Sequence, residues 1–93
     1  MLVKVTKEDI ATGVKGRCNS CPVALAVSRT LDLEGIAVGP KTIYTWTHDW
    51  TVRAHPTPKE VHRFTKRFDR DAKVKPFEFE LEAGEVVNGR TSW

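Results

Sequence analysis

Near both ends of the chain, apolar and polar residues alternate. Residues 2–6 read Leu-Val-Lys-Val-Thr, and residues 77–82 alternate three apolar residues with three glutamates. A period of two is typical of strands, so we predict one strand at each segment. The row of glutamates further indicates that one face of the second strand lies in water. Thr6 and Asp9 have the spacing of a capping box, which predicts a short helix directly after the first strand.

Two longer segments have the apolar periodicity of amphipathic helices. Residues 22–31 begin with a proline, which suits the first position of a helix, and this places Cys21 at the N-cap. The apolar stripe of this segment is wide, which indicates a well-buried helix. Residues 58–70 follow Thr57 as a cap, again with proline first and with Glu60 three positions after the cap. We therefore predict a second helix over this range.

The middle of the chain predicts a β-hairpin. Residues 36–38 and 42–46 are rich in strand-forming residues, and a further run of this kind covers residues 50–54. The residues between the last two runs are polar and suit a short turn. In this hairpin Trp46 and Trp50 would face each other across the strands, a pair that contributes a few tenths to about 1 kcal/mol.

Together these elements predict an α+β fold. The predicted order is strand, short helix, helix, two strands, helix and strand, which suits a small two-layer sandwich. The same order occurs in the split βαβ arrangement of ferredoxin-like folds, although other α+β topologies share it. A chain of 93 residues has room for one domain, which we place at residues 1–82, with residues 83–93 as a C-terminal tail.

Composition and charge limit the cellular setting more than the activity. The longest apolar run covers residues 22–27, far short of the about 20 residues that cross a bilayer, and the N-terminus lacks the pattern of a secretory signal. We therefore expect a cytoplasmic protein without membrane insertion. Fifteen basic and twelve acidic residues give a net charge of +3, which allows a nucleic-acid partner without requiring one.

Cys18 and Cys21 form a Cys-x-x-Cys motif at the start of the first long helix. A helix N-terminus lowers the pKa of a nearby thiol, so the motif is compatible with redox chemistry, although the following proline does not match the thioredoxin context. The two thiols could instead hold structural zinc with His48, His55 or His62, although no histidine pair has zinc-binding spacing. The simplest explanation is that Cys21 caps the helix and packs while Cys18 lies in a loop. We assign no cofactor.

Two other groups of residues are candidates for binding. The outer face of the 58–70 helix could contact phosphates, although charged outer faces are common on amphipathic helices. Its candidate nucleic-acid-binding residues are Lys59, Arg63, Lys66, Arg67 and Arg70. Aromatic residues could instead anchor a protein partner, since such side chains dominate the energetics of many interfaces. This second set is Tyr44, Trp46, His48, Trp50 and Trp93.

Several short blocks resemble a family of small uncharacterised proteins of actinobacteriophages and their hosts. The blocks are residues 10–13 (Ile-Ala-Thr-Gly), 18–26 (Cys-x-x-Cys-Pro-Val-Ala-Leu-Ala), 38–39, 68–69 and 74–81 (Val-Lys-Pro-Phe-Glu-Phe-Glu-Leu). They lie between residues 5 and 82, and the hairpin around His48 and the tail are outside them. The resemblance implies a phage or prophage setting, in which small accessory proteins act stoichiometrically on a host protein to inhibit it, redirect it or exclude a competing phage.

The sequence contains no Ser/His/Asp arrangement, Walker A loop, dinucleotide-binding fingerprint or HExxH motif, so we expect binding and not catalysis. The leading hypothesis is a non-enzymatic phage accessory protein that binds and modulates a host protein in the bacterial cytoplasm. The first alternative is a nucleic-acid-binding domain that uses the basic face of the 58–70 helix. The second alternative is a redox or structural-zinc protein that acts through Cys18 and Cys21.

Overall fold

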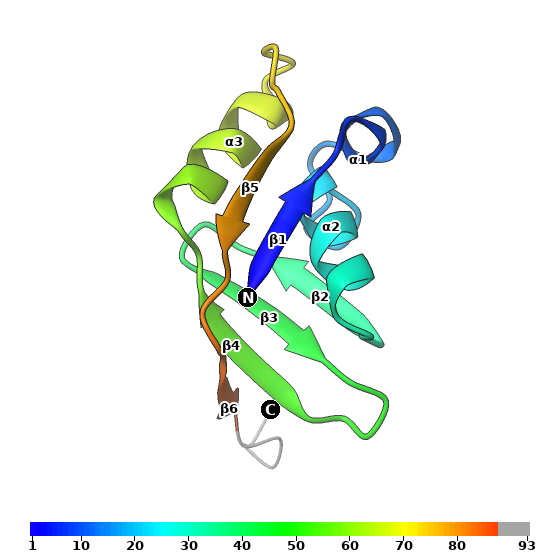
Figure 1. Ribbon diagram of the computed structural model, residues 1–93, viewed down its shortest axis with the longest axis vertical. Helices are drawn as coiled ribbons and strands as arrows, with labels where there is room; N and C mark the ends of the chain where they lie inside the picture. Colours follow the sequence, from blue (N-terminus) through cyan, green and yellow to red (C-terminus); the bar gives the residue numbers. More distant parts are fainter. Residues whose placement is uncertain (88–93) are drawn as a thin grey trace.

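The computed structural model describes residues 1–87, which form three helices and six strands (Figure 1). The elements are β1 (Leu2–Val5), α1 (Lys7–Thr12), α2 (Pro22–Thr30), β2 (Gly35–Val38), β3 (Thr42–Trp46), β4 (Val52–Pro56), α3 (Lys59–Asp69), β5 (Phe77–Glu80) and β6 (Glu85–Val87). This is an α+β fold, as predicted. The order of elements differs from the predicted one in two places: residues 35–46 form two strands, β2 and β3, where one was expected, and β6 follows β5. Within residues 1–87, no helix combines the length and apolar character needed to cross a membrane.

The strands form two separate antiparallel sheets. β1 pairs with β5, while β2, β3, β4 and β6 follow one another in a four-stranded sheet. A ferredoxin-like fold would place its strands in one sheet, so this topology, which the order of elements allowed, is not the one found. The structure is consistent with this at the free edge of β1, where the Arg29 guanidinium donates a hydrogen bond to the carbonyl oxygen of Lys4 at 2.9 Å. A side chain bonded there blocks that edge to a further strand.

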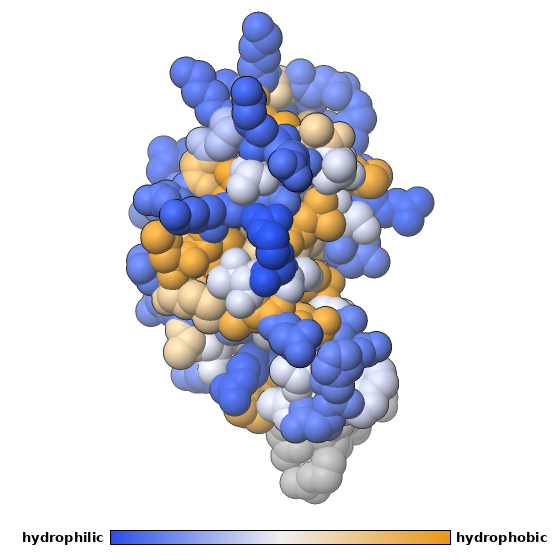
Figure 2. Space-filling view, turned by 45° about the vertical axis from the view of Figure 1, so that its right-hand side comes forward, coloured by the Kyte–Doolittle hydropathy of each residue, from blue (hydrophilic) through white to orange (hydrophobic). Residues whose placement is uncertain are grey.

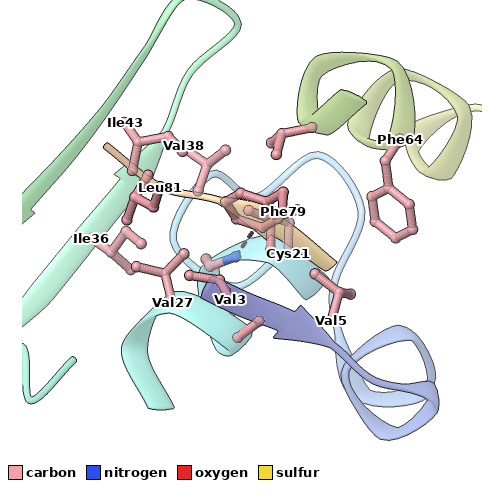
Figure 3. Close-up of a cluster of buried hydrophobic side chains, with 14 residues drawn as sticks. Val3, Val5, Cys21, Val27, Ile36, Val38, Ile43, Phe64, Phe79 and Leu81 are labelled. Carbon is pink, nitrogen blue, oxygen red and sulfur yellow. Dashed lines mark hydrogen bonds between the residues drawn. The ribbon is translucent and has the colours of Figure 1, made fainter. Parts of the chain in front are cut away.

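One hydrophobic core joins the two sheets. Val3 and Phe79 contribute to it from the small sheet, and Ile36 and Ile43 contribute from the large one. Figure 3 shows these side chains converging with residues of α2 and α3. Leu81, which directly follows β5, is also almost fully buried in this cluster. The two sheets are therefore halves of one packed unit, which measures 40 × 22 × 21 Å.

β6 lies within the segment that the sequence predicted as a tail. It pairs with β4, where Val87 is opposite Val52. The approach to β6 passes close to His55, because a Cβ atom on Gly84 would lie 2.7 Å from the imidazole ring. The N–H at Nδ1 of His55 donates a hydrogen bond to the carbonyl oxygen of Glu82 at 2.9 Å. Residues 85–87 thus belong to the four-stranded sheet, and residues 88–93 lie outside the described part.

The hairpin differs from its prediction in register. β4 begins at Val52 and not at residue 50, so Trp46 faces Val52 across the strands. Trp50 lies in the connecting loop with a φ of 66°, in the left-handed region. A residue in that conformation cannot continue an extended strand. The predicted cross-strand pair of Trp46 with Trp50 is therefore wrong.

The caps of α1 and α2 are the predicted ones, but the cap of α3 is not. Thr6 and Asp9 exchange both hydrogen bonds of a capping box, and the sulfur of Cys21 caps α2. In α3 the N-cap is the proline that follows Thr57. The hydroxyl of Thr57 instead donates a hydrogen bond to the carbonyl oxygen of Gly39 at 2.9 Å. A tertiary contact with the β2–β3 turn therefore replaces the local cap.

An ion pair between a buried carboxylate and a half-exposed guanidinium ties α1, α2 and β1 together. Asp9 is only 3% exposed, and its two carboxylate oxygens accept hydrogen bonds from the Arg29 guanidinium at 2.7 and 2.9 Å. The same carboxylate accepts the backbone N–H of Thr6. The hydrogen bonds from Arg29 lower the pKa of Asp9 below its ordinary value and outweigh the opposing effect of burial.

Replacing Asp9 with asparagine should destabilise the fold in a pH-dependent way. Near pH 7 we expect Asp9→Asn to lower the free energy of unfolding by about 1–3 kcal/mol, because a charge-assisted hydrogen-bonded pair is broken. The pKa of Asp9 is lower in the folded chain, so the pair stabilises the fold above the unfolded-state pKa of about 4. This contribution is lost as the pH falls through the folded-state pKa.

Urea unfolding near pH 7 and near pH 3 measures this effect, and the difference between wild type and Asp9→Asn should shrink at the lower pH. The matched control is Glu80→Gln, which removes an exposed ion pair with the N-terminal amine. That change should alter the free energy of unfolding by no more than about 1 kcal/mol. A stability difference for Asp9→Asn that is equal at both pH values would contradict the assignment.

Candidate functional site

The four-stranded sheet has one face in the core and one face turned outward. Side chains alternate along a strand, so neighbours in sequence point to opposite faces. Ile36, Val38 and Ile43 are buried and mark the inner face. All the residues that this sheet contributes to the core cluster come from that face. The residues between them therefore lie on the outer face.

The outer face carries a group of apolar residues that we call the aromatic face. Tyr44 on β3 stands in register between Ala37 and Ala54, so small side chains flank its ring and 44% of the residue is exposed. Trp46 lies across Gly35 so closely that a Cβ atom there would be 2.2 Å from the indole. The members of the aromatic face are Ala37, Tyr44, Trp46, Val52, Ala54 and Val87.

Trp50 lies in the loop between β3 and β4, at the end of the aromatic face nearest Trp46. It is 71% exposed. Asp49 holds the loop, because its carboxylate accepts hydrogen bonds from the Thr47 hydroxyl at 2.5 Å and from the Thr51 N–H at 3.1 Å. These hydrogen bonds lower the pKa of Asp49. An exposed non-glycine residue held in the left-handed region is a feature that concentrates at functional sites.

His48 fixes the same loop to the segment before β2. Its Nδ1 atom lies 2.5 Å from Oε2 of Glu34, and its Nε2 atom lies 4.0 Å from Oδ1 of Asp32. The backbone N–H of Glu34 also donates to the carbonyl oxygen of Trp46 at 2.9 Å. The predicted anchor His48 is therefore engaged by carboxylates and supports the position of the loop.

The two cysteines occupy different environments. Cys21 is buried, and its sulfur accepts a hydrogen bond from the Ala24 N–H at 3.5 Å. Burial raises the pKa of the Cys21 thiol, and this effect outweighs the lowering by the N–H groups of the helix start. The expected lowering of that pKa is therefore wrong. Cys18 is exposed, and both thiols are free.

The histidines considered as zinc ligands have other partners or surroundings than the two cysteines. His55 is 4% exposed, and its Nε2 atom is hydrogen-bonded to the Thr45 hydroxyl at 2.9 Å. Its other ring nitrogen is bonded to Glu82, as described above. His62 is exposed on α3. Over residues 1–87, no three His, Cys, Asp or Glu side chains gather where they could hold a metal ion.

The five basic residues predicted on α3 are all exposed. None of them takes part in an ion pair with another residue of the described chain. Lys15, Lys73 and Lys75 lie near Arg67 around one hollow of the surface. Sequence reasoning missed these three lysines, because Lys15 is distant in the chain and the other two lie beyond the end of the helix.

The structure thus places part of the predicted aromatic set together. Tyr44 and Trp46 share the outer face of the sheet, and Trp50 and His48 occupy the adjoining loop. Trp93 lies outside the described residues. Sequence reasoning missed the small residues that flank Tyr44, although alternation within the predicted strands was a signal that could have found them.

The chain has no match among protein-family models, curated proteins or solved structures. By its fold and its outer face, the chain is a small α+β domain that displays aromatic side chains on a sheet and on an ordered loop.

The two tryptophans of the hairpin should respond differently to substitution. Trp50→Gly should leave the free energy of unfolding unchanged or raise it by up to about 1 kcal/mol, because glycine adopts the left-handed conformation without steric cost. Trp46→Ala should lower it by about 1–3 kcal/mol, because the half-buried indole covers Gly35. Urea unfolding of both variants measures this. An equally large loss of stability in Trp50→Gly would show that Trp50 packs in the fold.

The two thiols should differ in reactivity. At neutral pH iodoacetamide should alkylate Cys18 readily, whereas Cys21 should react only after denaturation, because it is buried and the pKa of its thiol is raised. Intact mass spectrometry counts the adducts in each condition. Rapid double alkylation of the folded chain would contradict this and restore the redox alternative.

Proposed function

We propose that this chain is a non-enzymatic binding domain that docks on a host protein through its aromatic face and the adjoining Trp50 loop. The observation that carries the proposal is the display of Tyr44 and Trp50 to solvent on ordered backbone. Tyr44 is held by two flanking strands, and Trp50 is held by the hydrogen bonds of Asp49. Preorganised aromatic side chains lose little conformational entropy on binding.

The chemistry of this surface supports a protein partner. Ala37 and Ala54 lie on either side of Tyr44 in register, so small side chains leave both sides of the ring open to a partner. Glu85, opposite Ala54 on the edge strand β6, places a charge at the border of this surface. Interface centres are enriched in tyrosine and tryptophan and depleted of most charged residues. Such aromatic residues contribute most of the binding free energy in many complexes.

The environments of the reactive side chains also favour binding over catalysis. Both ring nitrogens of His55 are used in hydrogen bonds inside the fold. Burial raises the pKa of Cys21, which disfavours the nucleophilic thiolate. Each of these groups therefore has a structural role that accounts for its position.

The resemblance to actinobacteriophage proteins adds the kind of partner to this proposal. A phage accessory protein of this size would act by forming a stoichiometric complex with a host protein and so inhibit or redirect it. Exclusion of a second phage is one outcome of such a complex. The resemblance covers blocks on both sides of the hairpin, so the aromatic face would provide what is specific to this chain.

A capture experiment with matched variants tests the proposal. Tagged wild-type chain should retain one host protein from nuclease-treated actinobacterial lysate. Trp50→Gly and Tyr44→Ser should weaken that interaction by about 30-fold or more, as expected for anchor residues. Mass spectrometry identifies the bound protein, and titration of the purified pair gives the affinities.

The control variant is Val14→Ser, which changes an apolar residue that is 47% exposed and lies away from the hairpin. It should bind the host protein as the wild type does. All variants must unfold cooperatively and be at least as stable as the wild type before their affinities are compared. Undiminished capture by both Trp50→Gly and Tyr44→Ser would exclude the aromatic face as the binding surface.

A further inference from the structure

A hollow of about 780 Å³ lies between α1, the end of α3 and the turn that follows α3. Four basic residues line it, namely Lys15, Arg67, Lys73 and Lys75. Its apolar lining consists of Ile10, Phe68 and Val74, which are partly buried against the core. We call this hollow the basic groove. Asp71 is its one acidic lining residue.

The acidic residues near the basic groove are occupied by the 13–17 loop. The carboxylate of Asp71 accepts hydrogen bonds from Nζ of Lys15 at 2.5 Å, and Asp69 accepts the backbone N–H of Gly16 at 3.0 Å. These contacts join segments more than fifty residues apart, and the pair of Lys15 with Asp71 forms part of the groove lining. Arg67, Lys73 and Lys75 have no carboxylate partner among the described residues.

The positive surface continues from the basic groove along the outer side of α3. Arg63 and Arg70 are neighbours of Arg67 at helical spacing, and Lys66 is a neighbour of Arg70. Like charges at these spacings destabilise a helix unless an anion lies against them. Residues 59–75 contain seven basic and three acidic side chains, a net charge of +4, whereas the whole chain carries +3. The excess positive charge of the protein is therefore concentrated here.

We propose that the basic groove and the adjoining outer side of α3 bind single-stranded nucleic acid. Arg67, Lys73 and Lys75 contact phosphates in the groove, and Arg63 and Arg70 contact phosphates that continue along the helix. A base leaves the strand and lies against Phe68. Figure 2 shows hydrophilic side chains projecting from the upper end of the molecule, which Figure 1 shows to be formed by α1, the end of α3 and the turn after it.

The shape and the extent of the charge favour a single strand over other anions. A mononucleotide could fill the groove but could not reach the cations along α3. A duplex hides its base faces, so it would leave the apolar lining of the groove without a ligand. An acidic peptide would satisfy the charges but offers no flat ring for Phe68, whereas bases stack readily on aromatic side chains.

Fluorescence anisotropy with a short fluorescein-labelled deoxythymidine strand tests this proposal. Binding should weaken steeply between about 50 and 200 mM salt, with a slope of about −0.7 in log affinity against log salt for each phosphate contacted. The double variant Arg67→Gln/Lys73→Gln should bind the strand at least about tenfold more weakly than the wild type, and its salt slope should be shallower. The control Lys4→Gln/Lys41→Gln removes the same charge elsewhere on the surface and should retain more affinity and the wild-type slope.

Phe68→Leu keeps an apolar side chain against the core and should weaken strand binding about fivefold or more by loss of stacking. Its unfolding curve must match that of the wild type, and Phe68→Tyr, which retains an aromatic ring, should restore affinity. Equal effects of the groove and control double variants would overturn the proposal. The proposal would also be overturned if a duplex, ATP or polyglutamate competed with the labelled strand as well as an unlabelled single strand does.

This inference is independent of the proposed function, because it concerns the opposite end of the molecule. Trp50→Gly should leave strand binding unchanged, and Arg67→Gln/Lys73→Gln should leave capture of the host protein unchanged. Failure of one proposal is therefore distinguishable from failure of the other.

Discussion

The ion pair between the buried Asp9 and the half-exposed Arg29 joins α1, α2 and the free edge of β1, on which much of the fold around the small sheet depends. Asp9 caps α1 through the Thr6 N–H and binds Arg29 of α2, and Arg29 also binds the Lys4 carbonyl oxygen on the free edge of β1. Among the described residues β1 pairs only with β5, and the other four strands form a separate sheet. A buried charge of this kind specifies one arrangement because few alternatives would leave it paired.

The four-stranded sheet leaves free the surface that we assign to partner binding, because elements of the fold cover only one of its faces. Here the four-stranded sheet meets the core with one face, and it turns Tyr44 and Trp46 outward with the other. The flanking small residues leave Tyr44 accessible to solvent, whereas Trp46 packs closely against Gly35 and is partly buried. The fold therefore divides the aromatic residues between anchoring and structural roles.

The two surfaces lie toward different ends of a molecule that is 40 Å long. Figure 1 shows the four-stranded sheet at one end and the close of α3 with α1 at the other. The aromatic face consists of apolar side chains with Glu85 at its border, whereas the basic groove concentrates the positive charge. A domain with this division could hold a protein and a nucleic-acid strand at the same time, because neither surface shares residues with the other.

Local signals in the sequence were sufficient for the elements and insufficient for their contacts. The capping box at Thr6 and the Cys21 cap were predictable, because each depends on residues within one helical turn. Trp50 could not be excluded from a strand by pattern, since its left-handed backbone depends on the hydrogen bonds of the loop around Asp49. Thr57 fits a helix cap by spacing, but its hydroxyl binds Gly39, which lies 18 residues away.

The candidate sites show the same division. By itself the sequence determined the α+β class, the basic side of α3 and the presence of aromatic residues in the hairpin, because hydrophobic periodicity and charge are local properties. Only the tertiary structure decided which aromatic rings are exposed, that Lys15 joins Arg67 at one groove, and that burial raises the pKa of Cys21. These features depend on residues far apart in the chain, and packing alone brings such residues together.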